Sequence, residues 1–348
     1  MNLRRICIAL GIALLVALPS FAQPGKHRVI IDTDPGTDDA LSILLALNSP
    51  ELKVEAFTVV PGNVVAKQGL DNALKLVSLA GRCDIPIAAG AQHPLLQPTY
   101  TATYWHGKNG LADIELPPSN CKVDPRFAAD LIIELIHKYP HEITLIPVGP
   151  LTNIALAVSK DPSIVGLVKD IVIMGGSITG GNVNGAAEAN IFGDPEAAQI
   201  VFNAGWMVTM VGSDAGERTL MNRKHLSQLE SGHGPQNDVA TKIAQFYIER
   251  SEKNGWDGAA MYDPLAVSVV IDPTLVTLKD MHVDVELKGE FTRGETVANR
   301  MGTFENNVLH GDHYEIDNVQ PLKNNARVCI GSDAERFLQL FISRVKDK

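Results

Sequence analysis

Cysteine is scarce in this sequence, and soft metal ligands do not cluster. Four cysteines occur among 348 residues, and Cys7 lies in an apolar N-terminal stretch. The other three, Cys83, Cys121 and Cys329, are too few and too scattered for a disulfide framework, although one pair could form in an oxidising compartment. No Cys-x-x-Cys motif or Cys/His cluster is present, so the sequence carries no signature of a zinc or redox centre.

Positive charge is also in short supply. The chain carries 30 lysines and arginines against 40 acidic residues, a net charge of −10, and it has no basic run. An acidic chain of this kind is a poor candidate for binding nucleic acid or an anionic membrane. With 45% hydrophobic residues, no internal repeat and no low-complexity linker, the composition is that of an ordinary globular protein.

The chain has no apolar run long enough for a comfortable transmembrane helix. Its most apolar stretch, "ICIALGIALLVAL", follows Arg4 and Arg5 and precedes "PSFA". This layout predicts a secretory signal peptide over residues 1–22, cleaved before Gln23; an uncleaved anchor is the alternative. Cleavage removes two positive charges and no acidic residue, so the net charge of residues 23–348 becomes −12. We therefore expect a secreted, periplasmic protein that does not contact the membrane after cleavage.

Short β-branched runs alternate with longer helical patterns along the chain. This alternation predicts βαβ units, and we expect one α/β domain over residues 23–348, doubly wound, with a mostly parallel central sheet flanked by helices. Strands are expected over Arg28–Asp32, Val54–Val60, Ile143–Val148, Asp170–Met174, Met207–Val211, Met281–Glu286 and Glu295–Asn299. Helices are expected over Asp38–Leu47, Ala66–Ala80, Arg126–Lys138, Thr152–Lys160, Pro195–Asn203, Asp238–Asn254 and Ser332–Val345, the last with Ser332 as its N-cap.

Four aspartates crowd the segment "DTDPGTDD" at residues 32–39, where the first strand meets a buried helix. Two carboxylates about 5 Å apart repel by roughly 3 kcal/mol at an effective dielectric of about 20. Helix capping by Asp38 and Asp39 contributes only about 0.3–1 kcal/mol each. A phosphotransfer site of the Asp-x-Asp type is a second explanation, and a bound cation is the third. Ligation by oxygen alone suits Ca²⁺ or Mg²⁺, and the spacing excludes an EF-hand loop.

Other unusual loops follow the next predicted strands. They read "VVPGNV", "PVGPLTN" and "MGGSITGGNVNGAAEAN". Ligands of open α/β sheets bind in the crevice at the carboxyl ends of the strands. We therefore expect these loops and the acidic segment to converge on one site at that edge of the sheet.

The ordered series of motifs resembles the nucleoside hydrolases, the inosine/uridine-preferring ribohydrolases. The family fingerprint Asp-x-Asp-Pro-Gly-x-Asp-Asp stands here as "DTDPGTDD". It is followed by "GN" at 62–63, "HGKNGL" at 106–111, "PVGPLTNIALA" at 147–157 and "GNVNGAAEANIFGDPEAA" at 181–198, and "YDPLAV" at 262–267 closes the series. The resemblance covers nearly all of the chain after the signal peptide.

This resemblance implies Ca²⁺-dependent hydrolysis of the N-glycosidic bond of ribonucleosides, through a transition state with oxocarbenium character. It places one Ca²⁺ on Asp34, Asp39, the main-chain carbonyl of Val148 and Asp263. Asp34 is also implied as the general base towards a metal-bound water, with Asp32 supporting from behind. The residues implied at the ribose are Asp38, Asn63, Met174, Asn182, Glu188 and Asn190.

Each of these residues also has a plainer interpretation. Asn63, Asn182 and Asn190 are typical turn asparagines beside glycines. Asp263 could cap the helix that follows it, and Met174 could pack in the core. The common order of the motifs, rather than any single residue, favours the functional interpretation.

The sequence departs from the family at Tyr262, where many base-unspecific members carry a histidine linked to protonation of the leaving base. Tyr262 or His106 could supply that proton. Alternatively, Trp105 or Trp256 could stack on the base, and these aromatic residues motivate the hypothesis of a purine-riboside or inosine preference. The segment "SDAGERTL" at 213–220 also differs from the "LDVT" type expected there.

Two other functions remain as alternatives. A non-catalytic periplasmic protein that binds nucleosides or ribose would keep the same pocket, and the missing histidine leaves this possibility open. An Asp-x-Asp phosphotransferase fits less well because Pro35 and Gly36 follow Asp34. The expected partner is a small ribonucleoside rather than a nucleic acid, and the resemblance implies a homo-oligomer, dimeric or tetrameric.

Overall fold

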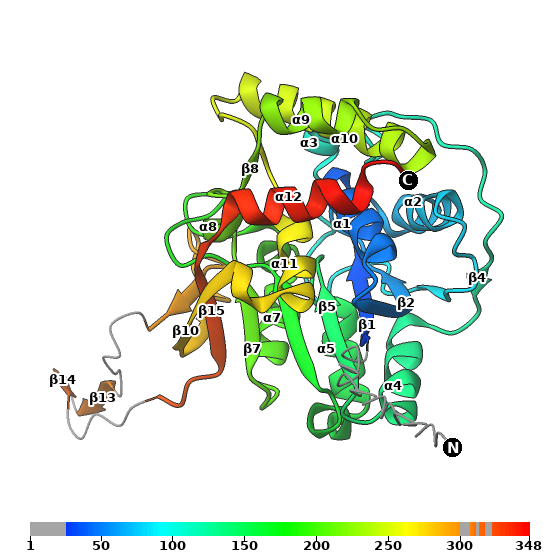
Figure 1. Cartoon of the computed structure of the whole chain (residues 1–348). Coiled ribbons are helices and arrows are strands. Elements are labelled where there is room, and N and C mark those ends of the chain that lie inside the picture. The colour runs from blue at the N-terminus through cyan, green and yellow to red at the C-terminus, as the bar shows by residue number, and fades with distance from the viewer. Residues whose placement is uncertain (1–25, 300–306, 311–312, 317–321) are drawn as a thin grey trace, which may run out of the picture.

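A nine-stranded, mostly parallel β-sheet forms the centre of the molecule in this computed structural model (Figure 1). The structure describes residues 26–299, 307–310, 313–316 and 322–348, so the predicted signal peptide and its cleavage site lie outside the described residues. The order of the strands is β10-β15-β7-β6-β5-β1-β2-β3-β4, and all neighbours are parallel except β10 and β15. The predicted fold class is confirmed.

The strands of this sheet are β1 (His27–Thr33), β2 (Leu52–Val59), β3 (Ile87–Ala89), β4 (Val123–Asp124), β5 (Ile143–Pro147), β6 (Asp170–Met174), β7 (Val208–Val211), β10 (Val276–Met281) and β15 (Ala326–Ser332). Three small two-stranded sheets pair β8 (Leu220–Met221) with β9 (Ala259–Ala260), β11 (Val283–Val285) with β12 (Thr296–Ala298), and β13 (Asn307–His310) with β14 (His313–Ile316).

The helices are α1 (Thr37–Asn48), α2 (Ala66–Leu79), α3 (Thr103–His106), α4 (Ala128–Lys138), α5 (Thr152–Lys160), α6 (Ala189–Gly193), α7 (Pro195–Phe202), α8 (Ser213–Gly216), α9 (Arg223–Glu230), α10 (Pro235–Lys253), α11 (Tyr262–Ile271) and α12 (Ala334–Val345). Within the described residues, no helix combines the length and the hydropathy needed to cross a membrane.

Two apolar cores lie on opposite faces of the sheet. Val29 and Ile31 of β1 belong to the first core, with α1, α2, α9, α10, α11 and α12, whereas Ile30 belongs to the second, with α4, α5 and α7. Successive side chains of a strand point to opposite faces, so the unbroken apolar run of β1 serves both cores. This is the pattern of a parallel sheet covered by helices on both sides.

The direction of the chain through the sheet reverses at β1. From β1 the chain moves outward through β2, β3 and β4, and it then returns to place β5 on the other side of β1. Ligands of doubly wound sheets bind at such a switch point, outside the carboxyl ends of the strands. The acidic segment follows β1 directly, so the topology places it at this position.

The first turn of α1 is unusually enclosed. Every residue from Thr37 to Ala46 is buried, the polar Asp38 and Asp39 of the first turn included, whereas the following turns are apolar on nearly all sides, as a fully buried helix needs. At its start, the backbone N–H of Gly36 donates to Asp39 Oδ2 at 2.9 Å. Asp39 therefore caps α1, which agrees with helix capping as one explanation of the acidic segment. This bond, however, involves only one of the four carboxylates.

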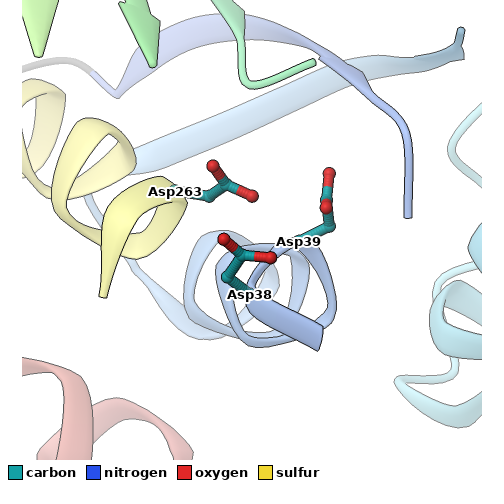
Figure 2. A group of neighbouring side chains, drawn as sticks. All are labelled: Asp38, Asp39 and Asp263. Atoms are coloured by element: carbon teal, nitrogen blue, oxygen red, sulfur yellow. The ribbon is translucent and has the colours of Figure 1, made fainter. Parts of the chain in front are cut away.

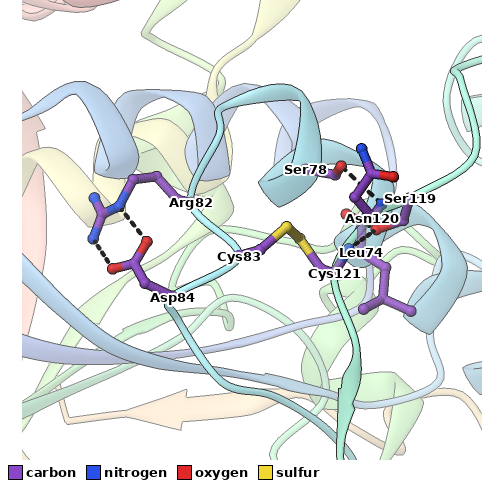
Figure 3. Close-up of a disulfide and its surroundings, with 8 residues drawn as sticks. All are labelled: Leu74, Ser78, Arg82, Cys83, Asp84, Ser119, Asn120 and Cys121. Atoms are coloured by element: carbon purple, nitrogen blue, oxygen red, sulfur yellow. Dashed lines mark hydrogen bonds and ion pairs between the residues drawn. A yellow bond between two sulfur atoms is a disulfide. The ribbon is translucent and has the colours of Figure 1, made fainter.

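One disulfide joins Cys83, just after α2, to Cys121 (Figure 3). The segment before Cys121 also bonds α2 directly: Ser119 Oγ donates to the Leu74 carbonyl at 2.8 Å, and the backbone N–H of Asn120 donates to Ser78 Oγ at 3.0 Å. Cys329 is buried and free. One pair has formed, as the scattered cysteines allowed.

The predicted elements need two corrections. Ser332 is the last residue of β15, where it pairs with Val276, and the N-cap of α12 is Asp333, whose side chain accepts a hydrogen bond from the Arg336 N–H. The strand predicted over Met281–Glu286 is divided, because β10 ends at Met281 and β11 pairs with β12 in a separate sheet.

Candidate active site

A cavity of about 430 Å³ opens at the carboxyl ends of the central strands, a volume typical of small-molecule sites. Val148 follows β5 there, and its N–H donates to the Asp32 carbonyl at 2.8 Å, which ties the ends of β5 and β1 together. Most of the predicted site residues line the cavity: Asp38, Asn63, Trp105, His106, Val148, Met174, Asn182, Glu188, Asn190, Trp256, Tyr262 and Asp263. Asp34 and Asp39 are not among the lining residues.

Asp34 and Asp39 are fully enclosed and held by a dense set of donors. Asp39 accepts hydrogen bonds from Thr33 Oγ1 at 2.5 Å and from Asn63 Nδ2 at 2.9 Å. Asp34 Oδ2 accepts the Asn63 N–H at 2.6 Å, whereas its Oδ1 is buried without a hydrogen-bond partner. A Cβ on Gly62 would lie 2.0 Å from Asp34 Oδ2, so only glycine lets the loop after β2 approach this carboxylate.

We call Asp34, Asp38, Asp39 and Asp263 the acidic floor. Figure 2 shows Asp38 and Asp39 in the first turn of α1 and Asp263 at the start of α11, with their carboxylates around a common space. One oxygen from each of these three residues lies within 4.8 Å of the others. Asp38 Oδ1 and Asp263 Oδ2 are buried without a partner in the described part of the chain.

Burial raises the pKa values of the whole acidic floor, and repulsion between the carboxylates adds to the effect at Asp34, Asp38 and Asp263. Burial raises the pKa of Asp38 to about 8, with the charge of Asp39 as the next cause. The pKa of Asp263 is raised well above its usual range, first by burial and then by the charge of Asp38. The described lining of the cavity includes no lysine or arginine. The floor therefore needs protons or a cation to offset its charge.

The residues of the floor fit a hard divalent cation. Carboxylate oxygens are the ligands that Ca²⁺ and Mg²⁺ prefer, and the buried oxygens without partners are acceptors that a cation would satisfy. The main-chain carbonyl of Val148, predicted as a ligand, accepts Asn190 Nδ2 at 2.9 Å. A carbonyl has a second lone pair for a metal.

The three closest carboxylates differ in one member from the predicted ligand set. Asp38, predicted to face the ribose, is in this group, whereas Asp34 is not. Asp34 remains within electrostatic reach, because its charge is among the causes that raise the pKa of Asp263. The individual ligand roles stay predictions.

The side chains predicted at the ribose are fixed by backbone groups. Glu188 accepts hydrogen bonds from the N–H groups of Gly176 and Asn190, both at 2.9 Å. Asn182 Oδ1 accepts the Ala189 N–H at 2.9 Å. Burial raises the pKa of Glu188 to about 7. These side chains border the cavity in fixed orientations, as a site that recognises sugar hydroxyls needs.

His106 lies at the edge of the acidic floor as a neutral imidazole. Its Nδ1 accepts the Thr37 N–H at 3.2 Å and lies 3.7 Å from Asp38 Oδ1. Burial lowers the pKa of His106 to about 3. The ring therefore carries its one proton on Nε2 at neutral pH, and it holds the start of α1 through Nδ1.

We call Trp105, Glu217, Tyr247, Trp256 and Tyr262 the aromatic end of the cavity. Trp105 and Tyr247 meet edge to face, with ring centroids 6.4 Å apart. Burial raises the pKa of the Tyr262 phenol, followed by the charge of Glu217, while a hydrogen bond with the Asn182 side chain opposes this. Tyr262 therefore keeps its proton at neutral pH.

Sequence reasoning missed several residues of the lining. Tyr247 lies within the predicted helix at Asp238–Asn254, but no local pattern marks its face as the one that borders a cavity. Glu217 lies in the segment "SDAGERTL", whose departure from the family pattern was the available signal. Two tyrosines before and within α3, Tyr100 and Tyr104, also line the cavity and were not predicted.

Comparison with known proteins agrees with this geometry. A family model described as "Inosine-uridine preferring nucleoside hydrolase" matches residues 29–339. A protein of that description from Crithidia fasciculata is 38% identical over 322 residues, which is 92% of this chain and 97% of the relative.

Two solved structures extend the likeness to the fold. The plant nucleoside hydrolase PpNRh1 has a TM-score of 0.82 and 36% identity, covering 93% of this chain and all of that one. A purine-preferring ribonucleoside hydrolase from Gardnerella vaginalis has a TM-score of 0.81 and 35% identity, covering 91% and 98%. The chain belongs to the nucleoside hydrolase family, the enzymes that hydrolyse the N-glycosidic bonds of ribonucleosides.

Proposed function

We propose that this enzyme depends on Ca²⁺ and that the acidic floor holds the ion. The observation that carries the proposal is a group of buried carboxylates with unpartnered oxygens, beneath a cavity whose described lining has no basic side chain. Asp34, Asp39, Asp263 and the Val148 carbonyl would hold the ion, with Asp38 close enough to join them. Ligation by oxygen alone favours Ca²⁺ or Mg²⁺ over zinc.

The chain's own residues would divide the chemistry. A bound Ca²⁺ would supply a water of lowered pKa next to the sugar. Asp34 Oδ1, buried and unpartnered, is suited to accept a proton as general base. Asn63, Asn182, Glu188 and Asn190 would orient the ribose through its hydroxyls, and Tyr262 would donate a proton to the departing base.

In this proposal the enzyme prefers purine ribosides or inosine as its substrates. Trp105 and Trp256 border the cavity, and an indole ring is a suitable stacking partner for a large base. The Gardnerella vaginalis relative is described as purine-preferring, whereas the Crithidia fasciculata relative is described as inosine–uridine preferring.

We further propose that the protein is exported to the periplasm after loss of residues 1–22 and that it works as a dimer or tetramer there. The first part rests on the basic, apolar and small-x-Ala layout of the N-terminus. N-terminal sequencing of the exported protein and its mass in solution test the two parts separately.

One panel of assays tests the central proposal. The purified protein is mixed with inosine, uridine or 2′-deoxyuridine, with Ca²⁺ or EDTA, and free base is measured. We expect release from inosine above uridine, little from 2′-deoxyuridine because a site built for a hydroxyl rejects its absence, and none in EDTA. Tight binding without release would instead identify a nucleoside-binding protein, and phosphate release from a phosphoester would identify a phosphotransferase. Full activity in EDTA would refute the role of the metal.

A further inference from the structure

Glu217 is the acidic residue at the aromatic end, and the reaction described above gives it no task. It follows α8, which begins two residues after β7, and it borders the same cavity as Tyr262 and Trp256. Its backbone is fixed, because its N–H donates to the Ser213 carbonyl at 2.8 Å.

The neighbouring residue brings Glu217 against the ring of Tyr262. A Cβ on Gly216 would lie 2.1 Å from Tyr262 Cδ1, so the tyrosine ring rests directly on the backbone of Gly216. The side chain of Glu217 therefore starts beside this ring. Tyr262 is the first residue of α11 and directly precedes Asp263 of the acidic floor.

The side chain of Glu217 is only partly buried; burial and then the charge of Asp214 raise its pKa, and the charge of Arg218 opposes this. Among the described residues, no side chain or backbone group makes a hydrogen bond or ion pair with the Glu217 carboxylate, and the guanidinium of Arg218 points instead to the Ile330 carbonyl at 3.5 Å. An ionised carboxylate only accepts hydrogen bonds. The described cavity lining has no lysine or arginine to meet it, so a ligand that fills this end must bring the donors.

We propose that Glu217 is a specificity-determining residue that binds the pairing edge of guanine. This inference rests on the proposed nucleoside site and names the base it prefers. Guanine offers two adjacent donors, N1–H and the 2-amino group, which match the two oxygens of a carboxylate in a bidentate, charge-assisted pair. Hypoxanthine offers only N1–H, and adenine and cytosine place a bare ring nitrogen beside their amino group. Uracil places its N–H between two carbonyls, which would repel the second oxygen.

Guanosine and inosine make the sharpest pair of probes because they differ only in the 2-amino group. In Glu217→Gln, the amide places an N–H where a carboxylate oxygen had been, and this N–H opposes the 2-amino group of guanine. We expect kcat/KM for guanosine to exceed that for inosine in the unmodified enzyme. The ratio should fall at least tenfold in Glu217→Gln, because only guanosine loses the match at its 2-amino group, which inosine lacks. Glu115→Gln is the matched control, because Glu115 is exposed and does not border the cavity.

Dissociation constants of the free bases guanine and hypoxanthine, which have no glycosidic bond to hydrolyse, give a second readout that needs no turnover. A fall in the guanosine-to-inosine ratio of kcat/KM, matched by a fall in the affinity for guanine relative to hypoxanthine, supports the proposal if Glu115→Gln changes neither. An unchanged ratio, or an equal loss for both nucleosides, overturns it while the hydrolase activity on inosine stands. If no nucleoside releases its base, the proposed reaction fails, and the ratio of dissociation constants alone decides the role of Glu217.

Discussion

The acidic floor and the aromatic end of the cavity are built in different ways. The floor comes from the ends of strands and the first turns of α1 and α11. Its carboxylates are buried, and those of Asp34 and Asp39 are held by backbone and short polar groups. The aromatic end draws its side chains from α3, α8, α10 and α11 and from the loop before β9, and Trp256 is only partly buried. Rigidly held carboxylates suit a catalytic site, whose reacting groups must keep their positions. Side chains from separate helices and loops can instead adjust their positions to different bases.

Removal of a floor carboxylate should have the largest effect on activity. In Asp263→Asn we expect kcat/KM for inosine to fall roughly a thousandfold or more, because a metal ligand is lost. The same change should raise the Tm in EDTA by about 1–3 °C, since Asp38, Asp39 and Asp34 all repel Asp263. Thermal unfolding and base release measure the two effects, with the exposed Asp280→Asn as control. Near-normal turnover would show that the floor is not the catalytic part.

Buried acidic residues beside the floor should also make the stability of the protein depend on pH. Burial raises the pKa of Asp32 from 3.8 to about 7, and that of Glu188 from 4.5 to about 7. In the folded state these groups keep protons that the unfolded chain has released. Their contribution to stability is fully present below about pH 4 and is lost as the pH rises through about 7.

In EDTA, the Tm should therefore be higher at pH 5.5 than at pH 8.5. Saturating Ca²⁺ should reduce or reverse the difference, because metal binding favours the ionised carboxylates. Asp32→Asn removes one of the two groups and should flatten the dependence in EDTA. A Tm in EDTA that rises with pH over this range would contradict our account of the buried acids.

The floor could be predicted from the sequence far better than the aromatic end. The segment "DTDPGTDD" can be recognised as a candidate site because four like charges between two apolar runs need an explanation. The family resemblance adds Val148 and Asp263, which come from distant segments. Tyr247 gave no such signal, because an aromatic residue within an amphipathic helix looks the same whether it faces a core or a cavity.

The fold shows the same limit. The long strands β1, β2, β5 and β6 lay within two residues of their predicted bounds. The strands β3 and β4 span only three and two residues, too few for a periodic pattern, and their place in the sheet is decided by tertiary pairing.

Loss of the Tyr262 hydroxyl should have a smaller effect that depends on the leaving group. In Tyr262→Phe we expect kcat for inosine to fall about 100-fold, the lower end of the range for a lost general acid. Hydrolysis of 4-nitrophenyl riboside should change by no more than about threefold, because its leaving phenolate needs no proton. Equal losses on both substrates would mean that the hydroxyl positions the substrate instead of donating a proton.

The disulfide should have the smallest effect on activity, since neither Cys83 nor Cys121 borders the cavity. It closes a chain segment with a sequence separation of 38 residues, and its loss should cost about 2–4 kcal/mol of unfolding free energy by restoring freedom to the unfolded chain. In the double variant Cys83→Ser/Cys121→Ser, the Tm should fall, while kcat/KM at 25 °C stays within about twofold. The bonds from Ser119 and Asn120 to α2 persist without the disulfide, so the folded segment should keep its place. A large loss of activity in a fully folded double variant would show that the cavity depends on the disulfide. The segment around Cys83 and Cys121 would then be a third region that shapes the site, besides the rigid floor and the adaptable aromatic end.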